Sequence, residues 1–359
     1  MAEGANALRS LLISIRRWIR AQYFQNSILT NYMNDYLIKR IEPREYDFIL
    51  DLNKANEELL LPLDREKLDF FSQNAELFLI VYADGIPAGF LIALREGLEE
   101  YDIACYKWFC ERYSKFLYVD RVVIDEKFRN RGLAWRLYRS VFDRARELGI
   151  DTVAAAVTSM PYNGESMMFH KGTEYRCGMG FHEVGEMFVR GGTVKALQLA
   201  VSVQTPEERL LNEKLYFFYI SLSSGLISFD AYCEQLNDLF LVHNGQNDIL
   251  LELQLRTSDP KATFAALATY LHDKTAQLDI DRVGSLLFAE AEKQFSEDTD
   301  ELIDLSHKMY NIYRCHLLPS VFLYDEPLVN LASIDDYWDW DGKDECIAQL
   351  RYLFNYYKN

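Results

Sequence analysis

Residues 124–134 read IDEKFRNRGLA and join a predicted strand to a predicted helix at 133–148. Gly132 removes the side chain where the backbone must approach a ligand, and the first amide groups of a helix have no acceptor within it. Such amides attract an anion, and Arg129 and Arg131 add positive charge at the same place. The stretch therefore predicts a phosphate-binding turn. A tight strand-to-helix turn that binds nothing is the alternative.

Strands and helices alternate around this stretch from residue 33 to residue 205. The apolar runs 77–82 and 86–94 flank Ala83-Asp84-Gly85, which is typical of a hairpin because Asp and Gly tolerate positive φ. This order predicts one α+β domain over residues 33–205 with a hairpin-rich mixed sheet. The other predicted elements are strands at 36–41, 116–124, 152–157, 181–188 and 194–203, helices at 43–56, 64–73 and 133–148, and an irregular aromatic segment at 96–113.

Several blocks in this domain resemble a known family. The pattern Arg-x-x-Gly-x-Ala at 129–134, which follows an apolar strand, resembles motif A of the GNAT superfamily of N-acetyltransferases. Residues 163–170, NGESMMFH, are similar to the family's Asn-x-x-Ala-x-x-Phe-Tyr helix, and Gly180-Phe181 to its closing Gly-Phe. The segments 106–109 and 116–121 look like a bacterial subgroup of predicted acetyltransferases. The resemblance covers residues 36–203 and implies the GNAT fold, a mixed, mostly antiparallel sheet with flanking helices.

The resemblance also implies a binding site. Acetyl-CoA would bind between two splayed strands as a co-substrate, without a metal, and an amine would attack its thioester directly. The N–H of Val123 on the splayed strand would meet the developing oxyanion. Asn163 would hydrogen-bond the pantetheine and Ser166 would lie near the pyrophosphate or the adenosine ribose, although Asn163 could instead be an ordinary helix cap. The implied cofactor-binding residues are Val122, Val123, Ile124, Arg129, Asn130, Arg131, Gly132, Leu133, Ala134, Asn163 and Ser166.

The acid that would protonate the departing thiolate differs from the family pattern. His170 stands where the family often has a tyrosine, and the stretch from His170 to Gly180 is longer than usual. A histidine with an ordinary pKa of about 6.5 suits acid catalysis near neutrality, but beside Phe169 it could also be a packed helix residue. Tyr118 and Tyr175 are the other candidate acids.

Asp120 is the first candidate for the base that takes the proton of the amine. It alternates with Val122 and Ile124, which predicts that the three side chains share one face of the strand. It could instead form a structural ion pair with Arg121. The remaining candidates are a chain of water molecules and the side chains of Glu99, Glu100 and His182.

Helical patterns replace strands after residue 205 and predict an all-helical domain at 206–359. This domain carries 27 Asp and Glu against 12 Lys and Arg. Such charge disfavours direct nucleic-acid binding and would attract a basic protein partner, unless it serves solubility alone. The run DDYWDWD at 335–341 is either a docking patch for that partner or a turn pinned by aromatic residues. The predicted helices span 206–222 and 228–242, capped by Thr205 and Ser228, and 248–255, 260–271, 281–295, 298–317 and 344–357.

Three features concern the cellular context. Residues 1–32 read as a basic amphipathic helix, which we expect to be a docking helix or an upstream extension rather than a targeting segment. No uninterrupted apolar run is long enough to span a membrane. The six cysteines form no CxxC pair and the histidines no His-x-x-x-His pair. We therefore expect reduced thiols, a cytoplasmic protein and no metal site.

We expect an acetyl-CoA-dependent N-acetyltransferase that acts on a small-molecule or protein amine, with an acidic helical domain that recognises the acceptor or a partner. The intact turn at 129–134 favours this hypothesis. Aromatic residues within 101–118 would stack on a flat or cationic acceptor or form a lid. The alternative is a non-catalytic interaction protein, of the immunity or antitoxin type, whose GNAT fold only binds CoA or is vestigial. The missing family tyrosine favours that alternative, and transfer of a different acyl group is a third hypothesis.

Overall fold

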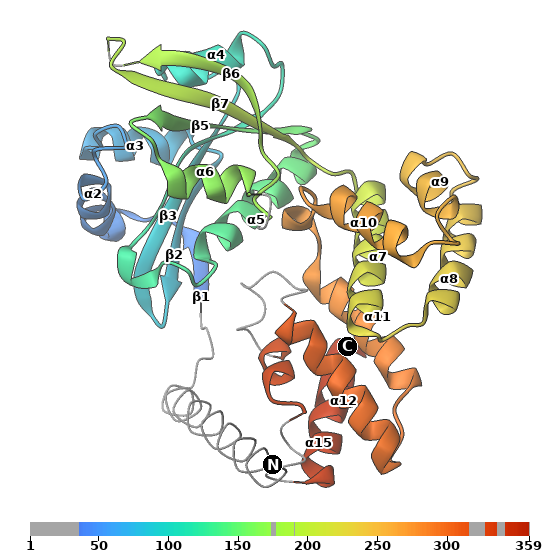
Figure 1. The fold of residues 1–359 in the computed structure, drawn as a ribbon. Helices are drawn as coiled ribbons and strands as arrows, with labels where there is room; N and C mark the ends of the chain where they lie inside the picture. Colours follow the sequence, from blue (N-terminus) through green and yellow to red (C-terminus); the bar gives the residue numbers. More distant parts are fainter. Residues whose placement is uncertain (1–35, 174–176, 190, 316–326, 336–341, 359) are drawn as a thin grey trace, which may run out of the picture.

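The computed structural model describes residues 36–173, 177–189, 191–315, 327–335 and 342–358. Within them, seven strands form one sheet in the order β1-β2-β3-β4-β5-β7-β6 (Figure 1). Only β4 and β5 are parallel, which confirms the predicted mixed, mostly antiparallel sheet. The strands are β1 (Tyr36–Arg40), β2 (Leu77–Ala83), β3 (Ile86–Arg95), β4 (Leu117–Ile124), β5 (Thr152–Met160), β6 (His182–Val189) and β7 (Val194–Ser202).

Three of the sequence predictions lie outside the described residues. They are the helix within 1–32, the candidate acid Tyr175 and residues 336–341 of the aspartate and tryptophan run.

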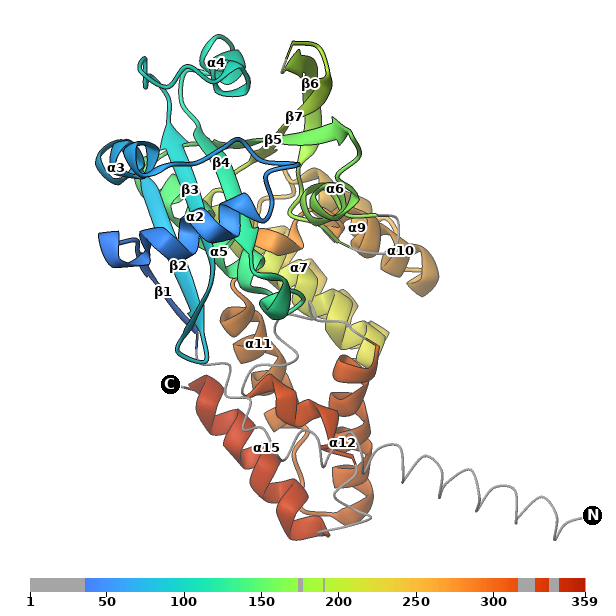
Figure 2. The same ribbon diagram turned by 90° about the vertical axis from the view of Figure 1, so that its left-hand side faces the viewer.

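Helices cover both faces of the sheet. The helix α5 (Leu133–Leu148) packs on one face, where Leu137 and Phe142 are fully buried against the strands. Figure 2 shows α2 in front of β2 to β4, with α5 behind them. The α5 face and the opposite face therefore each have a core, with β4 and β5 in the middle of the sheet. The helices on the opposite face are η1 (Pro43–Glu45), α2 (Tyr46–Lys54), α3 (Arg65–Asn74) and α4 (Ala104–Cys110), and α6 (Gly164–Lys171) follows β5.

The helix α4 corrects the prediction that residues 96–113 are irregular. Its own residues Tyr106 and Phe109 are buried, and the Tyr106 hydroxyl accepts from the Leu98 N–H at 2.9 Å and donates to the Arg95 carbonyl at 2.5 Å. The ring of Trp108 lies so close to Gly185 that there is no space for a Cβ atom at this position. Tertiary packing therefore stabilises a helix that local sequence preference does not indicate.

The C-terminal region is helical in its described part, as predicted. The first helix begins with the predicted cap, in which the Thr205 hydroxyl accepts from the Glu208 N–H at 3.2 Å and the Glu208 carboxylate accepts from the Thr205 N–H. No described helix has the length and apolar character needed to cross a bilayer. The helices are α7 (Pro206–Ser224), α8 (Phe229–Val242), α9 (Asp248–Gln254), α10 (Pro260–Leu271), η3 (Thr275–Gln277), α11 (Ile280–Lys293), α12 (Thr299–Arg314), η4 (Leu328–Ala332) and α15 (Lys343–Lys358).

The helical region is hydrogen-bonded directly to the sheet region. The side chain of Gln277 in η3 accepts from the Gln204 N–H at 2.9 Å and donates to the Ser202 carbonyl at 2.8 Å. The imidazole of His272 donates to the carbonyl of Thr173 at 2.9 Å. These contacts fix the helical region against the end of β7 and the segment that follows α6.

We expect Gln277→Ala to destabilise the protein at this junction. The variant leaves the buried Gln204 N–H without its acceptor, which should lower the free energy of unfolding by about 1–3 kcal/mol. Urea unfolding measures the change. Gln349→Ala is the matched control, because the Gln349 amide only donates to Glu345 one turn earlier on α15. Equal stability of the two variants would contradict a structural role for Gln277.

Candidate functional site

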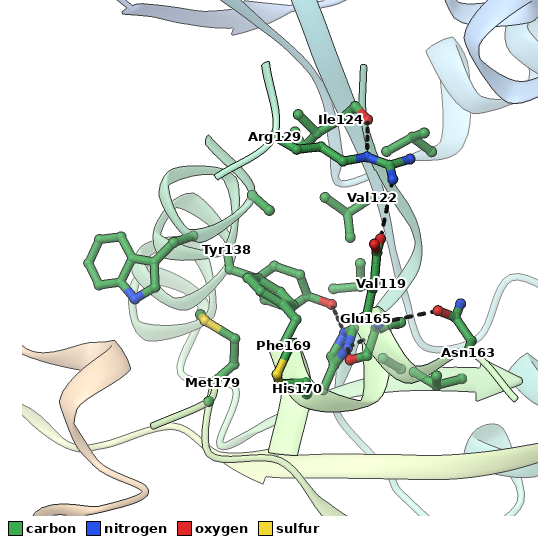
Figure 3. Close-up of a pocket in the computed structure, with 18 of the residues that line it drawn as sticks. Val119, Val122, Ile124, Arg129, Tyr138, Asn163, Glu165, Phe169, His170 and Met179 are labelled. Carbon is green, nitrogen blue, oxygen red and sulfur yellow. Dashed lines mark hydrogen bonds and ion pairs between the residues drawn. The ribbon is translucent and has the colours of Figure 1, made fainter. Parts of the chain in front are cut away.

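A cleft of about 1620 Å³ opens where β4 and β5 separate. The two strands pair only from Leu117↔Val153 to Val119↔Ala155, although both continue beyond this point. The cleft is lined by residues 119–124 of β4, residues 155–158 of β5, the beginning of α5 and the side of α6 (Figure 3). The predicted pair of splayed strands is therefore present in the middle of the sheet.

A β-bulge in β4 lies where the two strands separate. Arg121 pairs with Ile92 of β3, whereas Val119 pairs with the adjacent Ala93, so Asp120 is the extra residue. A bulge bends its strand and increases its twist. The bend directly follows the last pair between β4 and β5, and it accounts for the opening of the cleft.

The bulge and the register decide which amides of β4 face the cleft. Asp125 N–H donates to the Ala88 carbonyl at 2.9 Å. Because hydrogen-bonded and non-hydrogen-bonded pairs alternate in an antiparallel ladder, the Val123 N–H points to β3. The N–H groups of Val122 and Ile124 point into the cleft instead. The prediction that the Val123 amide meets an oxyanion is corrected accordingly.

The turn that is predicted to bind phosphate contains two residues with left-handed backbone conformation. Asn130 and Gly132 have left-handed φ values of 61° and 73°, and α5 begins at Leu133. Glycine adopts this conformation without strain and asparagine tolerates it. The first-turn amides of α5, which have no acceptor within the helix, lie beside the cleft, which Asn130, Gly132, Leu133 and Ala134 line.

The two arginines of the turn point in different directions. Arg129 donates to the Ile124 carbonyl at 3.4 Å and forms an ion pair with Glu165 of α6 at 3.2 Å, across the cleft (Figure 3). Arg131 forms an ion pair with Asp84 of the β2–β3 turn at 2.8 Å and does not line the cleft. The expected contribution of the Arg131 side chain to the site is therefore corrected. Its backbone still belongs to the turn.

Asn163 is a helix cap that also lines the cleft. Its carboxamide oxygen accepts from the Ser166 N–H at 3.2 Å, as the alternative interpretation of the sequence had it. Asn163 and Ser166 both lie on the cleft wall opposite α5. The carboxamide N–H groups of Asn163 are the donors that a bound pantetheine could use.

His170 is buried in a closed pair with Tyr138 of α5. Its Nδ1 lies 2.8 Å from the Ser166 carbonyl, which can only accept, so Nδ1 carries the proton and Nε2 accepts from the Tyr138 hydroxyl at 2.6 Å. Burial lowers the pKa of His170 to about 4. Near neutrality the ring is therefore uncharged and both nitrogens are occupied. The expected acid with a pKa near 6.5 is corrected by this environment.

Tyr138 is the residue of this group that sequence reasoning missed. It lies on the buried face of α5, lines the cleft and contacts the rings of Phe169 and Phe181 edge-on. Burial raises its pKa above the ordinary value for tyrosine. A polar-tipped aromatic on the apolar face of the predicted helix was the available signal.

Asp120 lines the cleft and is held by two partners. Its carboxylate accepts from the Tyr101 hydroxyl and from Arg121 Nε at 2.7 Å, and both charged side chains are 3% exposed. Arg121 in turn donates to Asn53 of α2 at 2.8 Å. The structure thus contains the ion pair between Asp120 and Arg121. Adjacent strand residues can meet in this way because the bulge interrupts the alternation, so the predicted shared face of Asp120, Val122 and Ile124 is wrong.

The other candidate acids and bases lie away from the cleft. Tyr118 is buried between Tyr106 and Phe109 under α4, and burial raises its pKa. It does not line the cleft, so its expected role as an acid is corrected. Glu99, Glu100 and His182 are exposed and do not line it either. Among the residues that the structure describes, no group of three or more His, Cys, Asp or Glu could hold a metal ion.

Comparisons with known proteins identify the sheet region. Residues 40–173 match the model of the acetyltransferase (GNAT) family, which confirms the resemblance. No curated protein sequence matches the chain. The likeness to the GNAT family therefore covers residues 40–173, while the helical region lies outside the match.

Solved structures of acetyltransferases also match about half of the chain. The *Escherichia coli* ribosomal-protein-S18-alanine N-acetyltransferase is 14% identical with a TM-score of 0.34, and the match covers 47% of this chain and 95% of that one. Ard1 from *Thermoplasma volcanium* is 14% identical with a TM-score of 0.37 and coverages of 47% and 98%. N-acetylglutamate synthase from *Neisseria gonorrhoeae*, complexed with coenzyme A and N-acetyl-glutamate, is 18% identical with a TM-score of 0.33 and coverages of 47% and 35%.

The buried histidine predicts a pH dependence of stability. Unfolding returns the pKa of His170 from about 4 to about 6.5, so the unfolded chain binds more protons between these values. The free energy of unfolding should rise with pH through this window by up to about 3 kcal/mol, and this part is lost as pH falls toward 4. Urea unfolding at several pH values measures it.

Two variants distinguish the contribution of His170 from that of other titrating groups. His170→Gln removes the titrating group and should lose this part of the pH dependence. Tyr138→Phe removes only the hydroxyl that His170 Nε2 accepts from and should keep it. Equal pH slopes for the wild-type protein and His170→Gln would show that His170 is not a buried neutral group.

Proposed function

We propose that the protein is an acetyl-CoA-dependent N-acetyltransferase that transfers the acetyl group directly to an amine. One observation carries the proposal. The cleft between the separated strands β4 and β5 lies beside the left-handed turn at the start of α5. This arrangement offers strand amides and helix amides along one cleft. The family match over residues 40–173 supports the same activity.

The residues of the cleft suit the parts of acetyl-CoA. The inward amides of Val122 and Ile124 are unpaired strand groups to which an extended pantetheine can hydrogen-bond. The α5 amides would hold the pyrophosphate. Arg129 and Glu165 are 39% and 80% exposed, so their ion pair is weak, and Arg129 can exchange it for a phosphate.

The proposed reaction balances without an acid from the protein. The amine nitrogen attacks the thioester carbonyl, the new C–N bond replaces the C–S bond, and the sulfur leaves as a thiolate. The proton that the amine loses is the proton that the thiolate needs. A donor such as the Ile124 or Val122 amide would stabilise the intermediate oxyanion. The closed pair of His170 and Tyr138 is compatible with this scheme because the scheme asks no proton from it.

Asp120 is the residue that we propose to orient or deprotonate the acceptor amine. It lines the cleft at the bulge, next to the last residues where β4 and β5 still pair. Its contacts with Tyr101 and Arg121 fix the carboxylate in one place. The exposed Glu57 and Glu58 of the segment after α2 also line the cleft, beside the exposed Lys54, and they would attract a cationic amine of a small molecule or a protein.

The aromatic residues within 101–118 are placed like those of a lid and not like a surface on which an acceptor stacks. Tyr101, Tyr106 and Phe109 are buried against the sheet, and none of them lines the cleft. The Trp108 ring is covered by the Arg112 guanidinium at 4.2 Å. We therefore propose that α4 covers the acceptor side of the sheet.

For the whole chain, we propose two domains, 33–205 and 206–359, in a cytoplasmic protein. The acidic domain would attract a basic protein partner and disfavour direct nucleic-acid binding. A non-catalytic interaction protein that only binds CoA is the second candidate function. The observation that favours it is the buried neutral His170 at the position of the family's tyrosine.

Ala134→Glu tests the cofactor site. Ala134 lies in the first turn of α5, where an acidic side chain suits the helix dipole, but here it would repel the pyrophosphate. We expect at least about a tenfold loss of acetyl-CoA affinity by calorimetry, which corresponds to about 1.4 kcal/mol, with no loss of thermal stability. Gly132 is a poorer site for this test because its φ of 73° would strain any side chain.

Ala231→Glu is the matched control, because it adds the same charge to the first turn of α8, away from the cleft. It should bind acetyl-CoA like the wild-type protein. Unchanged affinity in Ala134→Glu would contradict the assigned pyrophosphate site.

Thiol release with a panel of amines then separates the two candidate functions. If the protein is an N-acetyltransferase, the rate of CoA release should rise with the concentration of at least one amine. Asp120→Asn should lower this rate and leave the affinity for acetyl-CoA unchanged. Binding of acetyl-CoA with no amine-dependent release from either a small-molecule or a peptide panel would support the interaction protein.

A further inference from the structure

The cleft does not end at the sheet region. It extends onto α7, α10 and η3, where a group of residues that we term the helical wall lines it. The described residues of the helical wall are Tyr216, Tyr219, Ala268, Leu271, His272, Thr275 and Cys315. The C-terminal region thus forms part of the same cavity as the proposed cofactor site.

The helical wall adjoins the phosphate-binding turn. Trp135, which directly follows Ala134 in the first turn of α5, packs against the core of the sheet region and the core of the helical region. Trp135 also lines the cleft. The bond from His272 to the Thr173 carbonyl holds the wall in place on the side of α6. A ligand that extends from the α5 amides can therefore reach the wall within one cavity.

The helical wall differs in charge from the rest of its region. Residues 206–359 contain 27 Asp and Glu against 12 Lys and Arg, yet none of the described wall residues is acidic. An acidic wall would repel a phosphorylated ligand across the cleft. This exception in a strongly acidic region favours a ligand that carries phosphate groups.

The helical wall also contains a fixed aromatic surface. Tyr219 is half-buried, its ring stacks on Phe264 at 4.9 Å with 21° between the planes, and Tyr216 lies nearly parallel to it at 6.3 Å. An aromatic side chain that is held in this way gives a rigid surface on which the flat face of a base can stack.

We propose that the helical wall binds the nucleotide end of CoA, with Tyr219 as the main contact for the adenine. The inference rests on the proposed function, because it extends the site in which the α5 amides hold the pyrophosphate. The adenosine is joined directly to the pyrophosphate, on the side away from the pantetheine. With the pantetheine between β4 and β5, the adenosine lies at the end of the cleft that the helical region closes.

Binding of two probes by Tyr219→Leu tests the proposal. The probes are CoA and 4′-phosphopantetheine, which lacks the nucleotide, and calorimetry on the full chain gives both dissociation constants. Removal of the ring should weaken CoA binding by about fivefold to a hundredfold, the range for loss of one stacking contact to a base. It should leave 4′-phosphopantetheine binding unchanged.

Two further variants serve as controls. Tyr219→Phe keeps the ring and should retain CoA affinity. Tyr356→Leu removes a 47% exposed aromatic ring of α15 that does not line the cleft, and it should have no effect on either probe. Unchanged 4′-phosphopantetheine binding in Tyr219→Leu also shows that this variant is folded.

The possible failures are distinguishable. If the wild-type protein binds neither probe, the proposed function fails and the inference fails with it. If the wild-type protein binds CoA and Tyr219→Leu binds it equally well, only the inference is overturned. An equal loss for CoA and 4′-phosphopantetheine would also overturn it, because the effect would then not concern the nucleotide.

Discussion

The bulge at Asp120 is the constraint on which the arrangement of the site depends. One extra residue in β4 ends its pairing with β5 after Val119 and opens the middle of a sheet that would otherwise be continuous. The same residue reverses the alternation of the strand, so that Val122 and Ile124 present their amides to the opening. It also lets Asp120 and its neighbour Arg121 meet in a buried ion pair. The bulge thus accounts for the cleft, for the amides that face it and for the fixed position of the Asp120 carboxylate.

Burial determines what the polar side chains around this opening can do. His170 has the residue type of an acid, but it is enclosed by Tyr138 and by its own helix, so the ring stays neutral. Asp120 is equally buried, but the Arg121 guanidinium and the Tyr101 hydroxyl compensate its charge. The difference is the presence of a charged partner, because burial penalises the ionised form unless an opposite charge or hydrogen bonds offset it. Of these two side chains, only the Asp120 carboxylate has an opposite charge beside it.

The fold could be predicted largely from local patterns, whereas the site could be predicted only in part. The predicted helix 133–148 matches α5 at both ends, because the left-handed glycines that bound it, Gly132 and Gly149, are visible in the sequence. The direction of the Arg131 side chain and the inward amides of β4 could not be predicted. The direction of Arg131 depends on its ion pair with Asp84, which lies in a hairpin distant in sequence. The inward amides depend on a bulge that no residue of β4 indicates. Short-range signals therefore predict backbone geometry, and long-range contacts decide which groups face the cleft.

The distribution of acidic residues separates two surfaces of the helical region. A uniformly acidic region would oppose any phosphate brought to the junction, because like charges repel across a cleft. The helical wall has no acidic residue among its described members, while the region as a whole has an excess of 15 acidic over basic residues. Among the described residues, the acidic side chains of this region therefore lie away from the cleft. On this argument an anionic cofactor and a basic partner would use different surfaces of the same helical region and would not compete directly for one site.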